Sequence, residues 1–167
     1  MLRRLLFVAL GVLVLAVPRV AADHATAKSV FKRLQSLAGT WEGKDADGMA
    51  VKTVFKVVIS DTAVMETISP HGMEEMMTVY SVDRDGISLV HYCPTNNQPH
   101  MRVVPASDDV QELSFDFVDA GNLASPTAGH QHHLVFRFED ADHITETWTW
   151  RSNGKDTPMV FHLTRKK

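Results

Sequence analysis

The sequence contains one cysteine, Cys93, among 167 residues. No disulfide bond can therefore form within the chain, and its stability must come from the packing of a core. A chain of this length suffices for one domain and is short for two. It also lacks a Gly-rich phosphate loop and the strand–turn–helix nucleophile pattern of hydrolases, so no catalytic residue and no substrate can be assigned from motifs.

Basic residues are also scarce. The chain has 17 Lys and Arg against 20 Asp and Glu, and three of the basic residues (Arg3, Arg4 and Arg19) precede residue 23. Without those three the net charge is about −6. A protein that binds the phosphates of nucleic acid needs a basic face, which this charge does not favour. We therefore expect no nucleic-acid partner.

Only one long apolar run occurs, and it lies at the N-terminus. Arg3 and Arg4 precede 13 residues from Leu5 to Val17, and the small residues of Val20-Ala21-Ala22 follow. Thirteen helical residues span roughly 20 Å, which is short of the ~30 Å core of a bilayer. We expect a signal peptide over residues 1–22, export to the periplasm or secretion, and no stable membrane insertion after its removal. An uncleaved membrane anchor is the alternative.

Residues 23–38 form a lead segment with a short helix. Apolar residues recur at helical spacing, namely Val30, Phe31, Leu34 and Leu37. This spacing predicts a helix over Ala27–Leu37, with Gly39 as a natural stop. Such a helix can close one end of a barrel.

From Gly39 onward the apolar period becomes two, which is typical of strands. The expected strands are Gly39–Ala46, Met49–Ile59, Ala63–Ser69, Glu74–Val82, Ile87–Cys93, Gln98–Val104, Gln111–Val118, His130–Glu139, His143–Arg151 and Thr157–Thr164. No crossover helix separates them, so the pattern predicts an all-β fold over residues 39–167, a closed antiparallel up-and-down barrel of about ten strands. Ten strands leave an interior wide enough for a small ligand. Among the connections, only the loop Gly121–Gly129 is long enough to act as a lid.

Three short stretches resemble known barrel families. Gly39-Thr40-Trp41 resembles the Gly-x-Trp opening of the lipocalin and calycin group, where an arginine of the last strand packs on the tryptophan, and Arg165 stands in that place. The longer stretch Leu37–Gly43 also looks like nitrobindin-type haem barrels, which have ten strands. Leu89–Cys93 followed by Asn97–Met101 resembles exported bacterial lipocalin-like proteins of unassigned function. The resemblance implies a calycin-like barrel and supports the fold more than any chemistry.

Strand alternation sorts side chains by face. His130 and His132 fall on the face of Leu134, Phe136 and Phe138, and Glu146 falls with Ile144, Trp148 and Trp150. The same logic places His91 with Leu89 and Glu66 with Ile68. The predicted ligand-binding residues are Glu66, His91, His130, His132, Phe136, Glu146, Trp148 and Trp150. Because a buried unpaired charge is costly, the ionisable members should pair, bind water or contact a ligand.

The favoured function is an exported binding protein that holds a small, partly apolar ligand. Phe136, Phe138, Trp148 and Trp150 would form the wall, while His91, His132 and Glu146 would orient the polar end of the ligand. A filled core with a structural His91–Glu146 network is the simpler alternative. An enzyme is the alternative of a different class, using Glu66 or Glu146 with a histidine for proton transfer, or His91 with Cys93.

Metal and haem hypotheses also remain open, so no cofactor is assigned. His130-Gln131-His132 with His91 or Glu146 would suit zinc. Copper could use the soft ligands Met73, Met76 and Met77 with His71. Haem needs a histidine within the barrel, and His162 is a poor candidate because its neighbours Phe161 and Leu163 take the inner face. The sequence does not determine the ligand or the oligomeric state.

Overall fold

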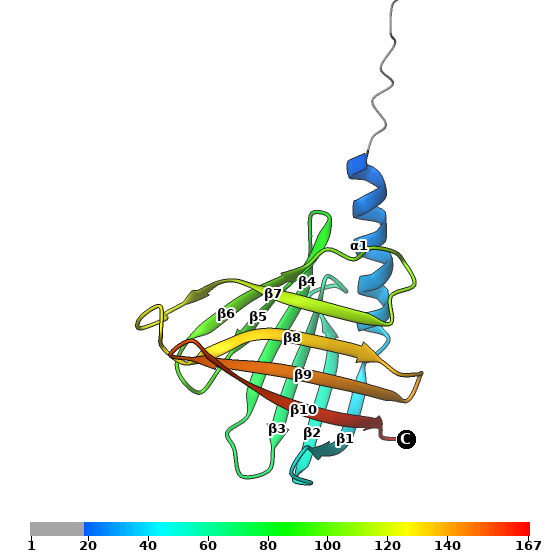
Figure 1. Cartoon of the computed structure of the whole chain (residues 1–167). Helices are drawn as coiled ribbons and strands as arrows, with labels where there is room; N and C mark the ends of the chain where they lie inside the picture. The colour runs from blue at the N-terminus through cyan, green and yellow to red at the C-terminus, as the bar shows by residue number, and fades with distance from the viewer. Residues whose placement is uncertain (1–18) are drawn as a thin grey trace, which may run out of the picture.

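A computed structural model describes residues 19–167, in which one helix is followed by ten antiparallel strands (Figure 1). The elements are α1 (Arg19–Gln35), β1 (Gly39–Asp45), β2 (Ala50–Val58), β3 (Ala63–Pro70), β4 (Met76–Asp83), β5 (Gly86–Tyr92), β6 (Gln98–Val103), β7 (Glu112–Gly121), β8 (His130–Phe138), β9 (His143–Ser152) and β10 (Lys155–Arg165). Each strand pairs with its neighbours in sequence, and β1 also pairs with β10. The predicted closed up-and-down barrel of ten strands is therefore confirmed.

The predicted helix is also present, with different bounds. It begins at Arg19 rather than at Ala27 and ends at Gln35 rather than at Leu37. Its last turn tightens, because the Leu37 amide donates to the Leu34 carbonyl at 3.1 Å. The apolar run Leu5–Val17 lies outside the described residues, so the signal peptide stays a prediction. None of the helices in residues 19–167 is long and apolar enough to cross a membrane.

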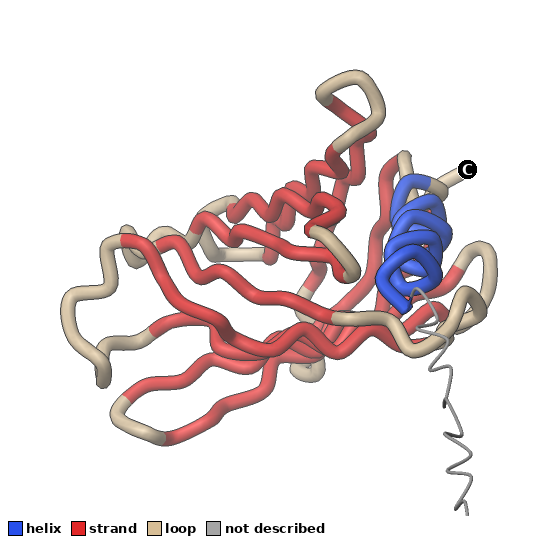
Figure 2. Tube along the Cα trace, turned by 90° about the horizontal axis from the view of Figure 1, so that it is seen from above, coloured by secondary structure: helices blue, strands red, loops and turns tan. Residues whose placement is uncertain are grey.

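Helix α1 lies against one end of the barrel (Figures 1 and 2). Its apolar side chains Val30, Phe31 and Leu34 are buried, and the helix contacts β4 and β5. On its other side, Arg33 donates to the Val110 carbonyl, and its guanidinium lies 4.3 Å from the centre of the Phe138 ring. The helix thus covers the end where the β4–β5, β6–β7 and β8–β9 connections lie, and we call the opposite end the far end.

Trp41 and Arg165 join the helix to the barrel. The fully buried Trp41 donates from Nε1 to the Leu37 carbonyl at 2.8 Å. The Arg165 guanidinium lies 4.3 Å from the Trp41 ring and donates to the carbonyls of Ser36 and Ala38 at 3.0 and 3.1 Å. This is the contact that the Gly-x-Trp resemblance implies, and it holds the end of α1, β1 and β10 together.

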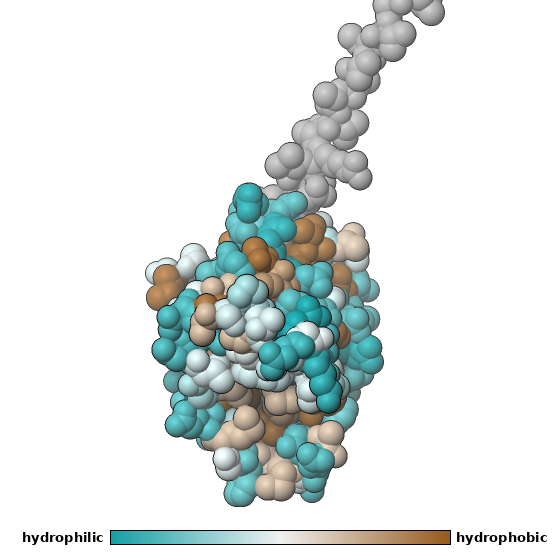
Figure 3. Space-filling view, turned by 60° about the vertical axis from the view of Figure 1, so that its left-hand side comes forward, coloured by the Kyte–Doolittle hydropathy of each residue, from teal (hydrophilic) through white to brown (hydrophobic). Residues whose placement is uncertain are grey.

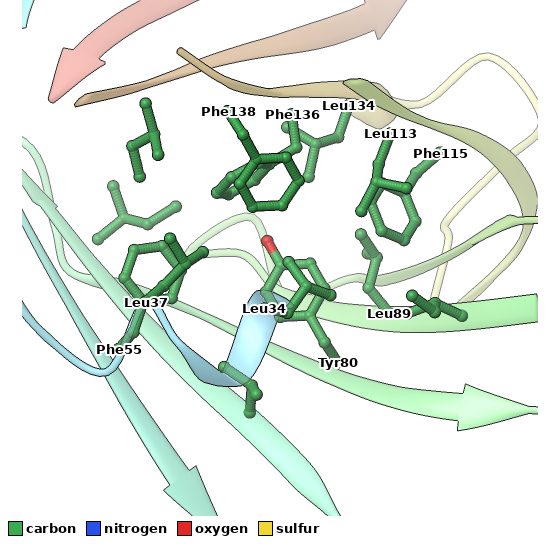
Figure 4. Close-up of a cluster of buried hydrophobic side chains, with 14 of the residues drawn as sticks. Leu34, Leu37, Phe55, Tyr80, Leu89, Leu113, Phe115, Leu134, Phe136 and Phe138 are labelled. Carbon is green, nitrogen blue, oxygen red and sulfur yellow. The ribbon is translucent and has the colours of Figure 1, made fainter. Parts of the chain in front are cut away.

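The half of the interior nearer the helix is filled by apolar side chains. Figure 4 shows Leu113, Leu134 and Phe138 facing Leu34 and Tyr80 across the barrel. The rings meet edge to face, with centroid distances of 6.4 Å for Trp41 and Phe55 and 6.2 Å for Phe55 and Phe136. The structure thus places Phe136 and Phe138, two of the predicted wall residues, in a packed core.

The Arg165 contact gives a test of stability. Replacing Arg165 with Ala removes the cation–π contact and the bonds to the carbonyls at the end of α1, which should lower the free energy of unfolding by about 2–3 kcal/mol. Urea unfolding of the purified protein measures this change. Arg137→Ala is the control, because Arg137 is 56% exposed in its ion pair with Glu112, and its loss should destabilise the protein much less than the loss of Arg165. Equal effects of the two substitutions would contradict the role of Arg165.

Candidate functional site

Two carboxyl groups interact inside the barrel. Glu66 of β3 and Glu146 of β9 are both 0% exposed, although β2, β1 and β10 separate their strands around the wall. Tyr80 donates its hydroxyl to Glu66 Oε2 at 2.7 Å, and Trp148 Nε1 donates to Glu146 Oε2 at 3.0 Å. The other oxygen of each glutamate, Oε1, accepts no bond from a donor outside the carboxyl pair. The Tyr80 hydroxyl points into the interior (Figure 4).

Their surroundings favour protonation of the pair. Burial raises the pKa of Glu66 well above its usual value, and the charge of Glu146 and hydrogen bonding to it raise it further. Burial also raises the pKa of Glu146, while hydrogen bonds with Glu66 and Trp148 partly oppose this shift. The pKa is raised for both groups, and the shift is larger for Glu66. Both shifts favour a pair in which Glu66 and Glu146 share one proton over a pair with two negative charges.

His91 extends this polar cluster toward the far end. It is 1% exposed, its Nδ1 lies 2.9 Å from Thr78 Oγ1, and its ring lies 4.7 Å from the Trp148 ring. Burial lowers the pKa of His91 to about 4, so the imidazole is neutral at pH 7. Its Nε2 has no hydrogen-bond partner, and the same holds for Oγ1 of the buried Thr53. In the described part of the chain no hydrogen bond joins His91 to Glu146; both contact Trp148 instead.

A β-bulge corrects the prediction for His130 and His132. The register passes from Gln131 opposite Trp150 to His133 opposite Thr149, which leaves His132 as an extra residue. The alternation therefore reverses, so that Gln131 shares the inner face with Trp150 and is buried, whereas His130 lies opposite Arg151. The prediction that His130 and His132 share the inner face with Leu134 was wrong.

His130 and His132 instead line a pocket on the flank of the barrel. Strand β7 pairs with β8 only from Glu112 to Asp116, and beyond this point the two strands diverge toward the far end (Figure 1). The Phe117 ring occupies the gap, at 4.9 Å from the His130 ring and 4.8 Å from the His132 ring. An open pocket of about 610 Å³ lies here, and we call it the flank pocket. Its lining comprises Phe117, Val118, Asp119, Ala120, Leu123, Ala124, Ser125, Pro126, His130, His132 and Arg151.

A chain of hydrogen bonds fixes the tautomers of both histidines. His130 Nδ1 lies 2.8 Å from the Ala128 carbonyl, which only accepts, so Nδ1 carries the proton. His130 Nε2 then accepts from His132 Nδ1 at 3.0 Å, and His132 Nε2 accepts from Arg151. Arg151 in turn binds both carboxylate oxygens of Asp156, at 2.6 and 2.7 Å. Burial and the charge of Arg151 lower the pKa of His132, in agreement with this arrangement.

The loop between β7 and β8 borders this pocket and is held to both neighbouring turns. Asn97 Nδ2 donates to the Gly129 carbonyl at 2.8 Å, and the Asn153 amide donates to the Thr127 carbonyl at 3.0 Å. Gly129 lies against Trp150 so closely that an added Cβ would stand 2.2 Å from its ring. The far-end surface that this loop helps to form mixes hydrophilic and hydrophobic residues (Figure 3). The predicted lid thus lies over Trp150, which is half-buried.

The residues of the metal and haem hypotheses do not come together. Within residues 19–167, no group of three or more His, Cys, Asp and Glu side chains could hold a metal ion. The bulge keeps His130 and His132 away from His91 and Glu146, and of the methionines Met73 is 57% exposed while Met76 is buried. His162 is exposed, as its position in the strand predicted, and its Nδ1 lies 3.2 Å from Thr145 Oγ1.

Comparison with known proteins supports the fold. No protein-family model matches the chain, and no curated protein matches its sequence. Among solved structures, the chain is similar to Rv2717c from M. tuberculosis, with a TM-score of 0.60 and 16% identity over 83% of this chain and 98% of that one. At this identity the similarity supports a barrel fold and says nothing about activity.

The carboxyl pair predicts how stability depends on pH. Because the folded pKa of Glu66 is raised above its unfolded value, stability is lost as the pH rises from about 4.5 through the folded pKa. Glu66→Gln removes this loss. The free energy of unfolding of the variant, taken relative to that of the wild type, should therefore rise by at least about 1 kcal/mol from pH 4.5 to pH 8. Urea unfolding at both pH values measures the difference. The exposed Glu112→Gln should give no such gain, and a gain equal to that of Glu66→Gln would contradict the buried pair.

His91 predicts the opposite dependence at acid pH. Its folded pKa of about 4 lies below the unfolded value of 6.5, so its contribution is present above pH 6.5 and lost as the pH falls toward 4. This difference between the folded and unfolded pKa corresponds to a loss of about 3 kcal/mol in the free energy of unfolding once His91 is fully protonated. His91→Gln should therefore flatten the acid limb of the stability profile, measured by urea unfolding between pH 7 and pH 4. An unchanged acid limb would show that His91 is accessible to protons in the folded state.

Proposed function

We propose that the protein is an exported, calycin-like binding protein that holds a small, partly apolar ligand inside its barrel. The observation that carries this proposal is a set of buried polar atoms that bond no protein group outside the carboxyl pair, namely Glu66 Oε1, Glu146 Oε1, His91 Nε2 and Thr53 Oγ1. Buried polar atoms almost always have a hydrogen-bond partner, and each exception calls for a bound water, ion or ligand. Their position in the interior of a closed barrel favours a bound molecule.

The predicted ligand-binding residues divide into three groups in this proposal. Glu66, His91 and Glu146 receive the polar end of the ligand, and Trp148 contributes apolar wall beside them. Phe136 forms part of the packed core behind the pair, opposite Glu146 across β8 and β9. Trp150, His130 and His132 belong to the far end and the flank, where they border the route of access.

Access through the flank follows from the divergence of β7 and β8. The sheet has no backbone pairing between these strands beyond Asp116, and the flank pocket opens at this gap. Phe117 stands between the pocket and the interior, because its strand partner Met101 is fully buried. Rotation of the Phe117 side chain and displacement of the 122–129 loop would then connect the solvent with the interior. Export rests on the predicted signal peptide, with the periplasm or the exterior as destination.

An acid–base enzyme is the second candidate, and the same pair favours it. Two interacting carboxyl groups with raised pKa values form a proton donor and acceptor at neutral pH, which is how paired carboxyl groups act in catalysis. A ligand that is recovered chemically changed after incubation, and unchanged with Glu146→Gln, would identify catalysis. A ligand that is recovered unchanged supports binding alone.

Two measurements test the binding proposal. Native mass spectrometry of the protein purified from the exported fraction should detect a bound organic molecule, or its uptake from an extract of that fraction. The neutral fluorescent probe N-phenyl-1-naphthylamine should accept energy from tryptophan, and Trp148→Phe should reduce this transfer because Trp148 lies beside the carboxyl pair. Trp41→Phe is the matched control, since Trp41 lies under Arg165 at the helix end. Stoichiometric zinc, copper or iron that is lost with His132→Ala would support a metal protein instead.

A further inference from the structure

The interior of the barrel has acidic groups and no basic partner. The buried polar or charged residues in the described part of the chain are Thr53, Glu66, Thr78, His91, Asn97, His130, Gln131 and Glu146, and none is a lysine or an arginine. The single imidazole beside the carboxyl pair, that of His91, is neutral at pH 7 because burial lowers its pKa to about 4. Nothing in this interior therefore compensates a negative charge on Glu66 or Glu146.

The hydrogen bonds that the pair does receive leave acceptors free. Tyr80 and Trp148 each donate to one oxygen, and Oε1 of each glutamate remains without a donor outside the carboxyl pair. His91 Nε2 is a third buried atom without a partner, on a side chain that is 1% exposed and packs on Trp148 next to Glu146. When His91 donates from Nδ1 to Thr78, this Nε2 is an acceptor as well. Once the proton that the carboxyl pair shares has left, these three atoms are all acceptors, and the only unpartnered hydroxyl among the buried side chains of residues 19–167 is that of Thr53.

Aromatic rings surround these acceptors. Phe55 lies opposite Glu66 across β2 and β3, and Phe161 lies opposite Glu146 across β9 and β10. Both rings are buried, as is the Trp148 ring that bonds Glu146. An aromatic ring whose face is turned toward the ligand would attract a cation and repel an anion, the same preference as that of the carboxyl pair.

We propose that the polar end of the ligand is a protonated amine on an apolar body, which Glu66, Glu146 and His91 bind together. This inference rests on the proposed binding function and narrows its ligand class. A primary ammonium group has three N–H donors and a positive charge, which matches the free acceptors and compensates the buried carboxylate. A fatty or aromatic carboxylate would instead bring a second negative charge into an interior that has no cation, which is strongly unfavourable.

The test compares three probes that share one body and differ at the polar end: 4-phenylbutylamine, 4-phenylbutanol and 4-phenylbutyrate. Titration calorimetry with the full exported protein near neutral pH should show the amine binding at least about tenfold more tightly than the alcohol, with the carboxylate weakest. Equal affinities for amine and alcohol, or tighter binding of the carboxylate, overturn the amine assignment and leave the binding function standing. Failure of all three probes to bind, together with no co-purified molecule, overturns both.

Variants locate the preference within the barrel. Glu66→Gln and Glu146→Gln should each remove the preference for the amine while retaining the affinity for the alcohol. Glu75→Gln is the matched control, because Glu75 is exposed and bonded only to Ser69 among the hydrogen bonds in residues 19–167. Persistence of the amine preference in both interior variants overturns the proposal.

A salt titration of the wild type keeps the test decisive if the interior variants fail to fold. The chain is acidic overall, so amines could also be attracted to its surface. Attraction between exposed charges is screened at about 0.5 M salt, whereas a buried pair is screened much less. The amine preference should therefore persist at high salt, and its loss there overturns the interior site.

Discussion

The barrel closes at the seam between β1 and β10, and every other feature depends on this closure. At the seam the two strands approach so closely that an added Cβ on Gly43 would lie 1.8 Å from the His162 carbonyl oxygen. Only glycine permits this approach. Two residues before Gly43 in β1, Trp41 is covered by the Arg165 guanidinium, which also donates to the carbonyls of Ser36 and Ala38 after α1. Closure and helix attachment are therefore one structural unit, which separates the interior from water and makes the chemistry of Glu66 and Glu146 that of buried groups.

That chemistry opposes stability in two directions. Burial disfavours the carboxylate forms of Glu66 and Glu146, which weakens the fold as the pH rises, and it disfavours protonated His91, which weakens the fold as the pH falls. Apolar residues of similar size at these positions would avoid both losses. Polar groups at the centre of a core that is otherwise apolar are thus easier to explain by something they bind than by stability. A bound cation would relieve the first of the two conflicts, because it favours the ionised pair.

Much of the fold was predictable from sequence, since ten segments alternate with period two between Gly-containing or polar turns. The same alternation predicted the burial of Glu66, His91 and Glu146, because each lies in a regular strand. It failed at His132, where one extra residue reverses the faces, and two adjacent histidines give no signal for a bulge. The divergence of β7 from β8 was equally hidden, because Phe117 fits an alternating strand whether or not a neighbour pairs with it. The contact between Glu66 and Glu146 needed the barrel geometry, since their strands are far apart in sequence.

The bulge at His132 connects the two sites that alternation had merged into one. On its inner side Gln131 is buried beside Trp150, with Oε1 unpaired; on its outer side His132 bonds His130 and Arg151 in the flank pocket. Every ring nitrogen of the two histidines is used in this chain of hydrogen bonds. His130 bonds Ala128 and Asn97 bonds Gly129, and both of these residues belong to the loop between β7 and β8. Because Gly129 also lies against Trp150, the loop, the flank pocket and Trp150 form one connected structure. In the proposed function, recognition would therefore lie with the regular strands and access with the irregular ones.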